Sequence, residues 1–268
     1  MIPCDTLFAH DRLALFGFGV FETLLITEEG PRFVNLHWQR MNTGADFLGL
    51  KLPDKNEWLN QIQEFIRQTS GSPPYALRVT LSGGAPLVDL PSKLLFHKRA
   101  IPYTPVQYAQ GIQLHLLPYP RNEQSPLIAI KSTNYLENII AKEAAKLQGA
   151  EEGLWLNTQG AVAEGTMSNL FFIKDGTLYT PSLSCGCLPG TRRQLVLDLA
   201  HTLQIPTQEG FYALSDLLSS DEIFMTNALM GIMPVRQIDD IPIPIAQKSV
   251  LRTLELAYKD LIMSSKRY

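Results

Sequence analysis

Lys131 is the first residue in this sequence whose position suggests covalent chemistry. It follows the apolar run 127–130, which predicts a short strand, and it precedes a predicted helix that begins near Asn134. An ammonium group at such a place is partly removed from water and lies near the positive end of a helix dipole, and both effects favour the neutral amine. A neutral amine condenses with an aldehyde to form an imine. The alternative is a lysine whose side chain reaches water at the end of the strand.

Glu164 is a candidate partner for a heteroaromatic ring. It follows the small apolar strand predicted at 161–163 and precedes the turn Gly165-Thr166-Met167-Ser168. A carboxylate beside a pyridinium nitrogen keeps that nitrogen protonated, so the ring can accept electrons from a neighbouring carbanion. The alternative is an ordinary glutamate on a surface turn.

Residues 188–193, with the sequence Leu-Pro-Gly-Thr-Arg-Arg, suggest a phosphate site. Gly190 lets the backbone approach a ligand closely, and the N–H groups and dipole of a helix starting at Thr191 favour an anion. Arg40 lies on another predicted helix, and a guanidinium can bind a phosphate through two hydrogen bonds. The alternatives are a plain junction between a loop and a helix, and a solvated helical arginine.

The segments that must position these residues mix strands and helices. The N-terminal half predicts strands at 18–26, 31–34, 75–81, 93–96 and 111–117, and helices at 35–48 and 55–68. The segment 119–126 is rich in proline and polar residues and is interpreted as a linker. We therefore expect an N-terminal α+β domain at 1–118 and a C-terminal domain that carries the cofactor at 127–268.

The C-terminal half begins with the strand 127–131 and a helix that Asn134 and Glu137 would cap reciprocally and Gly149 would end. Asp175-Gly176 predicts a hairpin between the strands 169–174 and 177–180. Further elements are expected as strands at 154–156, 161–163 and 222–226 and as helices at 191–203 and 246–262. Because strands and helices do not alternate regularly, the pattern favours α+β over a doubly wound sheet.

Composition excludes several classes of protein. The 268 residues carry a net charge of -3, which gives no basic excess for binding nucleic acid. The start of the chain does not resemble a secretory signal, and no apolar run is long enough for a membrane helix. The three cysteines, Cys4, Cys185 and Cys187, lack the spacing of a zinc site and fit a reduced, cytoplasmic compartment.

Taken together, the motifs resemble those of the class IV, or fold-type IV, enzymes that depend on pyridoxal 5′-phosphate (PLP). This family contains branched-chain aminotransferases, D-amino-acid aminotransferases and 4-amino-4-deoxychorismate lyase. The matching segments follow the family's order along nearly the whole chain: 19–23 (Gly-Val-Phe-Glu-Thr), 37–41, 130–136, 163–171, 188–192 and 225–235. The resemblance implies two α+β domains with PLP between them, a homodimer, and a small amino compound as substrate.

The resemblance also implies a role for each matching residue. Lys131 matches the lysine that forms the Schiff base with PLP, Glu164 the carboxylate at the ring nitrogen, and Arg40 the arginine that binds the phosphate. The remaining implied cofactor contacts are Tyr135 near the phenolic oxygen, Asn169 beside the site, Leu188 against the ring, Gly190, Thr191 and Arg192 in the phosphate cup, and Asn227, Ala228 and Leu229 in the loop that completes the pocket. No metal is expected.

Within the family, the short length and the stretch 227–230 look most like the lyase. That branch would release pyruvate and 4-aminobenzoate from 4-amino-4-deoxychorismate, with Lys131 as the proton-transferring group. Some members place an arginine in the glycine-rich loop after the strand 78–81, but this chain has Ser-Gly-Gly-Ala-Pro at 82–86. The residue that binds the substrate carboxylate is therefore unassigned. Arg78, His97 and Arg99 are candidates, but the favoured interpretation of each is an ordinary strand or surface residue.

Two alternatives to the lyase stay open at this point. One is an aminotransferase acting on a D-amino or branched-chain amino acid on the same scaffold. The other is a protein that binds PLP without catalysing a reaction, although the presence of both Lys131 and Glu164 argues against it.

Overall fold

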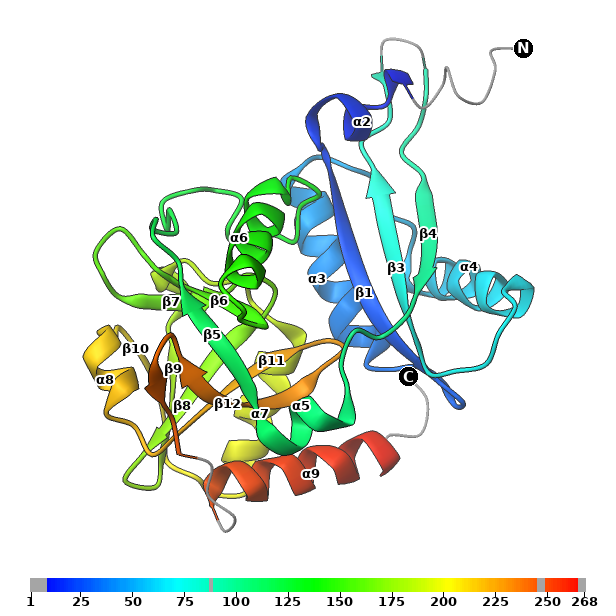
Figure 1. Cartoon of the computed structure of the whole chain (residues 1–268). Coiled ribbons are helices and arrows are strands. Elements are labelled where there is room, and N and C mark those ends of the chain that lie inside the picture. The colour runs from blue at the N-terminus through cyan, green and yellow to red at the C-terminus, as the bar shows by residue number, and fades with distance from the viewer. Residues whose placement is uncertain (1–8, 87–88, 245–248, 265–268) are drawn as a thin grey trace. The chain divides into compact units, whose positions relative to one another are not determined.

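The computed structural model describes residues 9–86, 89–244 and 249–264 (Figure 1). The described residues form two compact units. Unit 1 consists of the described residues within Met1–Ile101 together with Ile130–Tyr135. Unit 2 consists of the described residues within Pro102–Ala129 and Leu136–Ser265. The short segment that carries Lys131 therefore packs with the N-terminal part of the chain. The domain limits expected near residues 118 and 127 stay a prediction.

Unit 1 is built on an antiparallel sheet with the strand order β2-β1-β3-β4. Residues of β1 alternate between the two faces, and the even-numbered ones, such as Val20 and Leu24, pack with Trp58 and Ile62 in a buried core. Asp54 caps the second long helix by accepting hydrogen bonds from two backbone N–H groups. The elements of unit 1 are α2 (Arg12–Phe16), β1 (Gly19–Thr27), β2 (Gly30–Pro31), α3 (Val34–Phe47), α4 (Lys55–Gln68), β3 (Tyr75–Ser82) and β4 (Leu94–Arg99).

Unit 2 is built on a larger mixed sheet. In the described part of the chain it has nine strands, in the order β10-β9-β8-β11-β12-β5-β6-β7, with β13 paired to β12. One core cluster contains Leu170, Met225 and Met233, and another joins Phe171 and Phe224 to Val196 of α7 and Leu254 of α9. The sheet thus has apolar side chains on both faces, as a strand buried on two sides requires.

The remaining elements follow the chain order (Figure 1). They are α5 (Pro105–Gln110), β5 (Ile112–Leu116), α6 (Leu136–Leu147), β6 (Glu152–Leu156), β7 (Val162–Gly165), β8 (Asn169–Lys174), β9 (Thr177–Pro181), η2 (Leu183–Cys185), α7 (Thr191–Thr202), β10 (Thr207–Gly210), α8 (Leu214–Leu218), β11 (Glu222–Asn227), β12 (Gly231–Ile238), β13 (Ile241–Pro242) and α9 (Val250–Ser264). The α+β class is confirmed, and the Asp175-Gly176 hairpin forms with both residues at positive φ.

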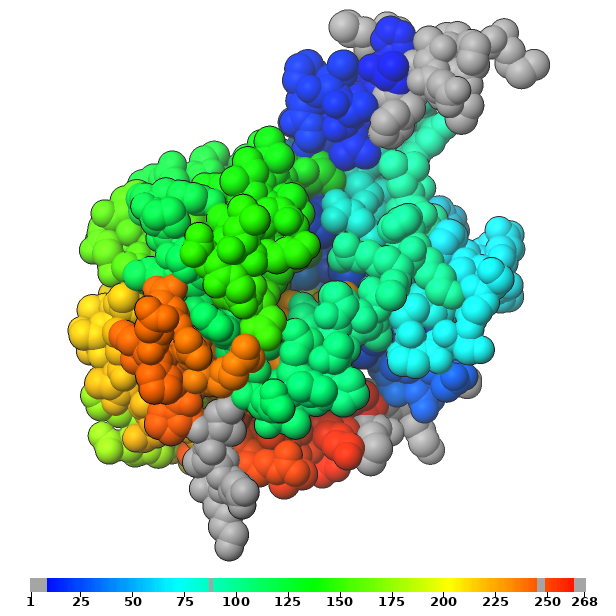
Figure 2. Space-filling view, viewed as in Figure 1, coloured from blue at the N-terminus to red at the C-terminus, as the bar shows by residue number. Residues whose placement is uncertain are grey.

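Helix α6 buries one face and leaves apolar side chains on the other. Asn138, Ala141 and Ala145 are buried at helical spacing. Leu136, Ile139, Ile140 and Leu147 are exposed. Helix α6 belongs to the green part of the surface in Figure 2. The large apolar side chains therefore lie mostly on the open face of α6, and its small residues pack against the rest of unit 2.

Three local predictions are wrong. Residues 127–130 form turns rather than a strand. The strand expected at 31–34 is reduced to Gly30–Pro31, because Phe33 adopts a left-handed conformation and α3 begins at Val34. The reciprocal cap of Asn134 and Glu137 is replaced by an ion pair, since the Glu137 carboxylate accepts a hydrogen bond from Arg121 at 2.7 Å.

Candidate active site

Lys131 lies beside β1 in unit 1, where its segment pairs with that strand. The Lys131 carbonyl accepts a hydrogen bond from the Phe21 N–H at 2.9 Å, and the Thr133 N–H donates to the Gly19 carbonyl at 2.8 Å. Gly19 permits this approach, because a Cβ there would lie 2.5 Å from the Leu81 carbonyl oxygen and 3.2 Å from Thr133 Oγ1. Backbone pairing therefore fixes the lysine, although the strand predicted before it does not form.

Aromatic rings surround the amine of Lys131. Its Nζ lies 4.5 Å from the ring centroid of Phe21 and 5.1 Å from that of Tyr135. These two rings meet edge to face, with centroids 5.1 Å apart and an interplanar angle of 87°. Lys131 is half-buried and Phe21 is buried. The rings thus hold the amine in a partly apolar setting, as the proposed chemistry requires.

Arg40 forms a bidentate ion pair with Glu22 in the same unit. Its Nε and Nη2 donate to the two carboxylate oxygens of Glu22, each at 2.7 Å, and His37 Nδ1 lies 2.6 Å from Oε2. Burial by itself would raise the pKa of Glu22, but the charges and hydrogen bonds of Arg40 and His37 outweigh it and hold that pKa at about 2. The carboxylate is therefore ionised at neutral pH and orients the guanidinium.

Arg40 and Lys131 contact neighbouring residues of β1. Glu22 and Phe21 are consecutive, so their side chains point to opposite faces of the strand. The structure places the guanidinium and the amine on either side of β1, and the phosphate-binding role of Arg40 stays a prediction. Glu22 was missed as a separate functional residue, because nothing in the sequence shows that it pairs with an arginine 18 positions away.

Glu164 is fixed inside unit 2 at the centre of a hydrogen-bond network. Its Oε2 accepts from the Leu188 N–H at 2.9 Å, and its Oε1 lies 3.4 Å from Arg121 Nη2. Arg121 is buried, and its guanidinium lies 4.5 Å from the ring centroid of Trp155. The surface-turn alternative for Glu164 is therefore wrong, since only 4% of this residue is exposed. Arg121 was also missed, because it lies in the segment interpreted as a linker.

The loop before α7 is held against Glu164 and Asn169. The Asn169 side chain donates to the Leu188 carbonyl at 2.8 Å. A Cβ on Gly190 would lie 1.8 Å from Asn169 Oδ1, so any larger residue would force the Asn169 side chain to move. Gly190 is also the N-cap of α7 and makes no side-chain capping hydrogen bond. The start of α7 therefore packs closely against Asn169, and the N–H groups and dipole of a helix start favour an anion.

Arg192 and Asn227 connect this helix start to the turn after β11. Arg192 is almost fully buried and its Nη2 donates to the Ala228 carbonyl at 3.0 Å. Asn227 Oδ1 accepts from the N–H groups of Leu229 and Met230, both at 2.9 Å, and its Nδ2 donates to the Tyr103 hydroxyl at 2.7 Å. The hydrogen bonds of Asn227 fix the conformation of the turn. The hydrogen bond of Arg192 connects the start of α7 to the same turn, whether or not Arg192 also binds a phosphate.

The predicted site residues thus fall into two groups, one in each unit. Unit 1 holds Arg40, Lys131 and Tyr135. Within unit 2, hydrogen bonds and chain continuity join the others: Glu164, Asn169, Leu188, Gly190, Thr191, Arg192, Asn227, Ala228 and Leu229. Burial raises the pKa of the nearby Cys187, with a further contribution from the charge of Glu164, to about 12, so its thiol is neutral at physiological pH.

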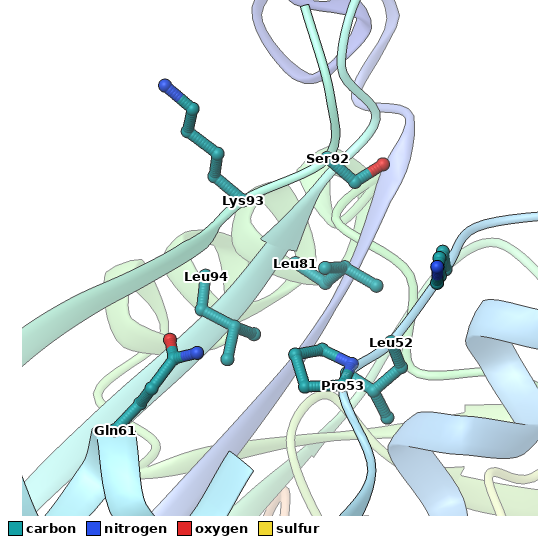
Figure 3. A pocket seen from close by; sticks show the side chains of 8 residues that line it. Leu52, Pro53, Gln61, Leu81, Ser92, Lys93 and Leu94 are labelled. Carbon is teal, nitrogen blue, oxygen red and sulfur yellow. The ribbon is translucent and has the colours of Figure 1, made fainter. Parts of the chain in front are cut away.

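A separate cleft of about 420 Å³ lies in unit 1 (Figure 3). Leu81 and Leu94 of the sheet line it together with Leu52 and Pro53, which precede α4. The remaining lining residues are Lys51, Gln61, Ser92 and Lys93. None of the predicted site residues lines this cleft, which therefore gives no support to the predicted cofactor chemistry.

Metal clusters and membrane-spanning helices are both absent from the part of the chain that the structure describes. Within residues 9–86, 89–244 and 249–264, no cluster of three or more His, Cys, Asp or Glu side chains is placed to hold a metal ion. No helix in those same ranges has both the length and the apolar character needed to cross a membrane.

Comparison with known proteins identifies several relatives. Residues 19–238 match the family model described as amino-transferase class IV. The aminodeoxychorismate lyase of Bacillus subtilis is 30% identical over 258 residues, covering 93% of this chain and 87% of the relative. A putative branched-chain-amino-acid aminotransferase of Methanocaldococcus jannaschii is 30% identical over 259 residues, with coverages of 94% and 89%. A crystal structure of a putative 4-amino-4-deoxychorismate lyase from Legionella pneumophila has a TM-score of 0.86 at 29% identity, covering 94% of this chain and 93% of that one.

Proposed function

Since this chain belongs to the class IV aminotransferase family, we propose that it is a lyase that converts 4-amino-4-deoxychorismate into 4-aminobenzoate and pyruvate. The family is that of PLP-dependent enzymes, and PLP is the cofactor. Relatives named for this lyase and relatives named for branched-chain aminotransferases match the chain equally well. The choice between the two reactions is therefore the part that is proposed.

The residues present fit PLP on chemical grounds. Lys131 offers an amine set among aromatic rings, and Glu164 offers a buried carboxylate for a ring nitrogen. Gly190 is the N-cap of α7, and the N–H groups and dipole of a helix start suit a phosphate. When bound, PLP supplies a ring that accepts electrons from the carbon bearing the substrate amine.

The protein's own groups would divide the work as follows. Lys131 Nζ would hold the cofactor and, when free of it, would take the proton from the carbon that bears the substrate amine. The resulting Lys131 ammonium would then give a proton to the departing side chain. Glu164 keeps the ring nitrogen protonated, and the Leu188 N–H and Arg121 fix its carboxylate in place. The carboxylate of Glu164 is therefore held in place by groups of the protein itself.

The observation that carries the lyase assignment is the turn after β11. It contains Asn227, Ala228 and Leu229, and aminotransferases of the family more often have a small hydroxylated residue where Ala228 stands. Without that hydroxyl the turn offers one donor fewer at the phosphate and substrate pocket. The similarity to the Bacillus lyase over most of both chains supports the same assignment.

A product assay tests the proposal. The purified PLP-loaded protein is incubated with 4-amino-4-deoxychorismate and no 2-oxo acid. We expect 4-aminobenzoate, followed by chromatography, and pyruvate, followed with lactate dehydrogenase, to accumulate in equal amounts. Lys131→Ala serves as the inactive control. The proposal is wrong if the wild-type protein makes neither product.

An aminotransferase is the second candidate, favoured by the equally similar Methanocaldococcus relative. It predicts transfer of an amino group from a D-amino or branched-chain amino acid to 2-oxoglutarate, with no 4-aminobenzoate formed. Running both assays on the same preparation separates the two reactions.

The proposal includes a homodimer acting in the cytoplasm. The family resemblance supports the dimer, and the composition, with its few cysteines, supports the reducing compartment. Light scattering on the PLP-loaded protein is expected to give twice the 30.0 kDa mass of one chain.

A further inference from the structure

The turn at residues 165–168 connects two side chains that bind the same backbone. It follows Glu164 of β7 and precedes Asn169, the first residue of β8. The Glu164 carboxylate accepts from the Leu188 N–H at 2.9 Å, and the Asn169 amide donates to the Leu188 carbonyl at 2.8 Å. The conformation of this turn therefore determines where the Glu164 carboxylate lies relative to Leu188.

A second buried carboxylate, that of Glu152, contacts the turn. Glu152 is the first residue of β6 and is fully buried. Its Oε1 accepts hydrogen bonds from the Thr166 N–H at 3.1 Å, from the Thr166 hydroxyl and from the Gly153 N–H at 3.0 Å. Its Oε2 accepts from the Ser168 hydroxyl at 3.1 Å. One carboxylate thus binds the turn at two points, Thr166 and Ser168.

Helix α6 adds two contacts from one of its faces. Asn138 and Lys142 are four residues apart and therefore lie on the same side of the helix. The Asn138 amide donates to the Thr166 carbonyl at 2.7 Å, and Lys142 Nζ pairs with Glu152 Oε2 at 3.2 Å. Lys142 supplies the positive charge that a buried carboxylate requires. Side chains of β6 and α6 therefore hold the turn by its N–H, carbonyl and hydroxyl groups.

The turn is also closed on itself. The Gly165 N–H donates to the Ser168 carbonyl at 2.7 Å. A Cβ on Gly165 would lie 2.5 Å from both Met225 Cε and Ser168 Oγ, so the turn packs closely against β11. Because the turn is compact, a displacement at Thr166 or Ser168 is passed on to the residues at its two ends.

We propose that Glu152 is a positioning residue of the cofactor site, which fixes the turn at 165–168 and thereby the place of the Glu164 carboxylate. This inference rests on the proposed function, in which Glu164 acts on the ring nitrogen of PLP. Glu152 itself contacts neither substrate nor cofactor in this account. A displacement of about 1 Å at a reacting group can lower a rate by about 100-fold, so a residue that acts through the turn affects the chemistry.

The pH dependence of the visible absorbance of the PLP-loaded protein tests the proposal without using turnover. Its midpoint depends on the charges around the bound ring, so Glu164→Gln is expected to shift it. Glu152→Met has a similar size and removes both acceptor oxygens, so it is expected to shift the midpoint in the same direction by a smaller amount. The same variant is expected to lower kcat about 10-fold, which is part of the loss expected for Glu164→Gln.

A double variant distinguishes positioning from a general loss of stability. If Glu152 acts through Glu164, then combining Glu152→Met with Glu164→Gln shifts the midpoint no further than Glu164→Gln alone. A purely structural Glu152 would lower the melting temperature and leave the midpoint at its wild-type value. The proposal is overturned by that second result, or by shifts of the two single variants that simply add.

Two further variants keep the test decisive. Glu151→Met is the matched control, because the Glu151 carboxylate contacts Arg236 and the Gln113 N–H instead of the turn, and it is expected to keep the wild-type midpoint. Thr166→Val nearly preserves the shape of its side chain but removes the hydroxyl that donates to Glu152. It is expected to shift the midpoint as Glu152→Met does, and it carries the test if Glu152→Met does not fold.

The outcomes also separate this inference from the proposed function. If Glu164→Gln shifts the midpoint and neither Glu152→Met nor Thr166→Val does so, only the role of Glu152 is wrong. If the variants at both glutamates shift the midpoint but no 4-aminobenzoate is made from 4-amino-4-deoxychorismate, only the lyase reaction is wrong.

Discussion

Replacing Glu22 with glutamine would test how unit 1 holds Arg40. Glu22 is fully buried, and it binds the Arg40 guanidinium through both carboxylate oxygens while also contacting His37. Glutamine has nearly the same size and keeps one acceptor oxygen, so Glu22→Gln removes the negative charge with little change in packing. The Arg40 guanidinium, whose side chain is 11% exposed, then loses the buried charge that it pairs with, and removing one partner is the costly way to break such a pair.

The pKa of Glu22 gives the size and the sign of the effect. It falls from 4.5 to about 2 on folding, which corresponds to roughly 3 kcal/mol at about 1.4 kcal/mol per pH unit. Because the folded pKa lies below the unfolded value, this stabilisation is complete above about pH 4.5 and is lost as the pH falls towards 2. Glu22→Gln should therefore destabilise unit 1 by about 3 kcal/mol at pH 7 and flatten its acid dependence.

Denaturant unfolding of wild type and variant between pH 2.5 and 7 provides the measurement, with pH values chosen to span the two pKa values. Glu64→Gln is the matched control, since Glu64 pairs with Arg67 on an exposed face of α4 and should contribute little. The reasoning is refuted if Glu22→Gln is as stable as wild type at pH 7, or if both proteins lose stability in parallel as the pH falls.

Two further predictions concern unit 2. Gly190→Ala should lower both the affinity for PLP and the melting temperature, because the new Cβ would lie 1.8 Å from Asn169 Oδ1. Adding Asn169→Ala should recover part of both losses. PLP titrations and thermal melts measure the two effects, and purely additive effects of the two substitutions would contradict the steric explanation. Glu164→Gln should still bind PLP, since an amide oxygen can accept from the Leu188 N–H, but should lower kcat by on the order of 100-fold or more. A variant with wild-type kcat would show that the carboxylate does not act on the ring.

Local sequence signals predicted most elements of the fold. The boundaries of α4 coincide with those expected, because Asp54 caps its start and Trp58 and Ile62 repeat at helical spacing. The Asp175-Gly176 hairpin follows from two residues that accept positive φ. The strand at 127–131 failed because a short apolar run does not specify extended structure without a pairing partner. Residues 131–133 instead pair with β1, and no pattern within the run indicates that contact.

The candidate site was predictable only in part for a similar reason. Spacing and the family resemblance identified Lys131, Glu164 and Gly190, but not the partners that orient them. Arg121 binds Glu164 from 43 positions away, and the ring of Phe21 joins Lys131 to Arg78 across three separate segments. Such contacts depend on tertiary packing and strand register, which a single sequence does not encode in its local pattern.

The central claim is that Lys131 binds PLP covalently, and borohydride reduction of the PLP-loaded protein tests it most directly. Reduction makes the bond between lysine and cofactor permanent, so peptide mass spectrometry can locate it. We predict the mass of the reduced cofactor on the peptide containing Lys131, and its absence from that peptide in Lys131→Ala. Attachment at a different lysine, or no attachment in a protein that retains its activity, would contradict the account.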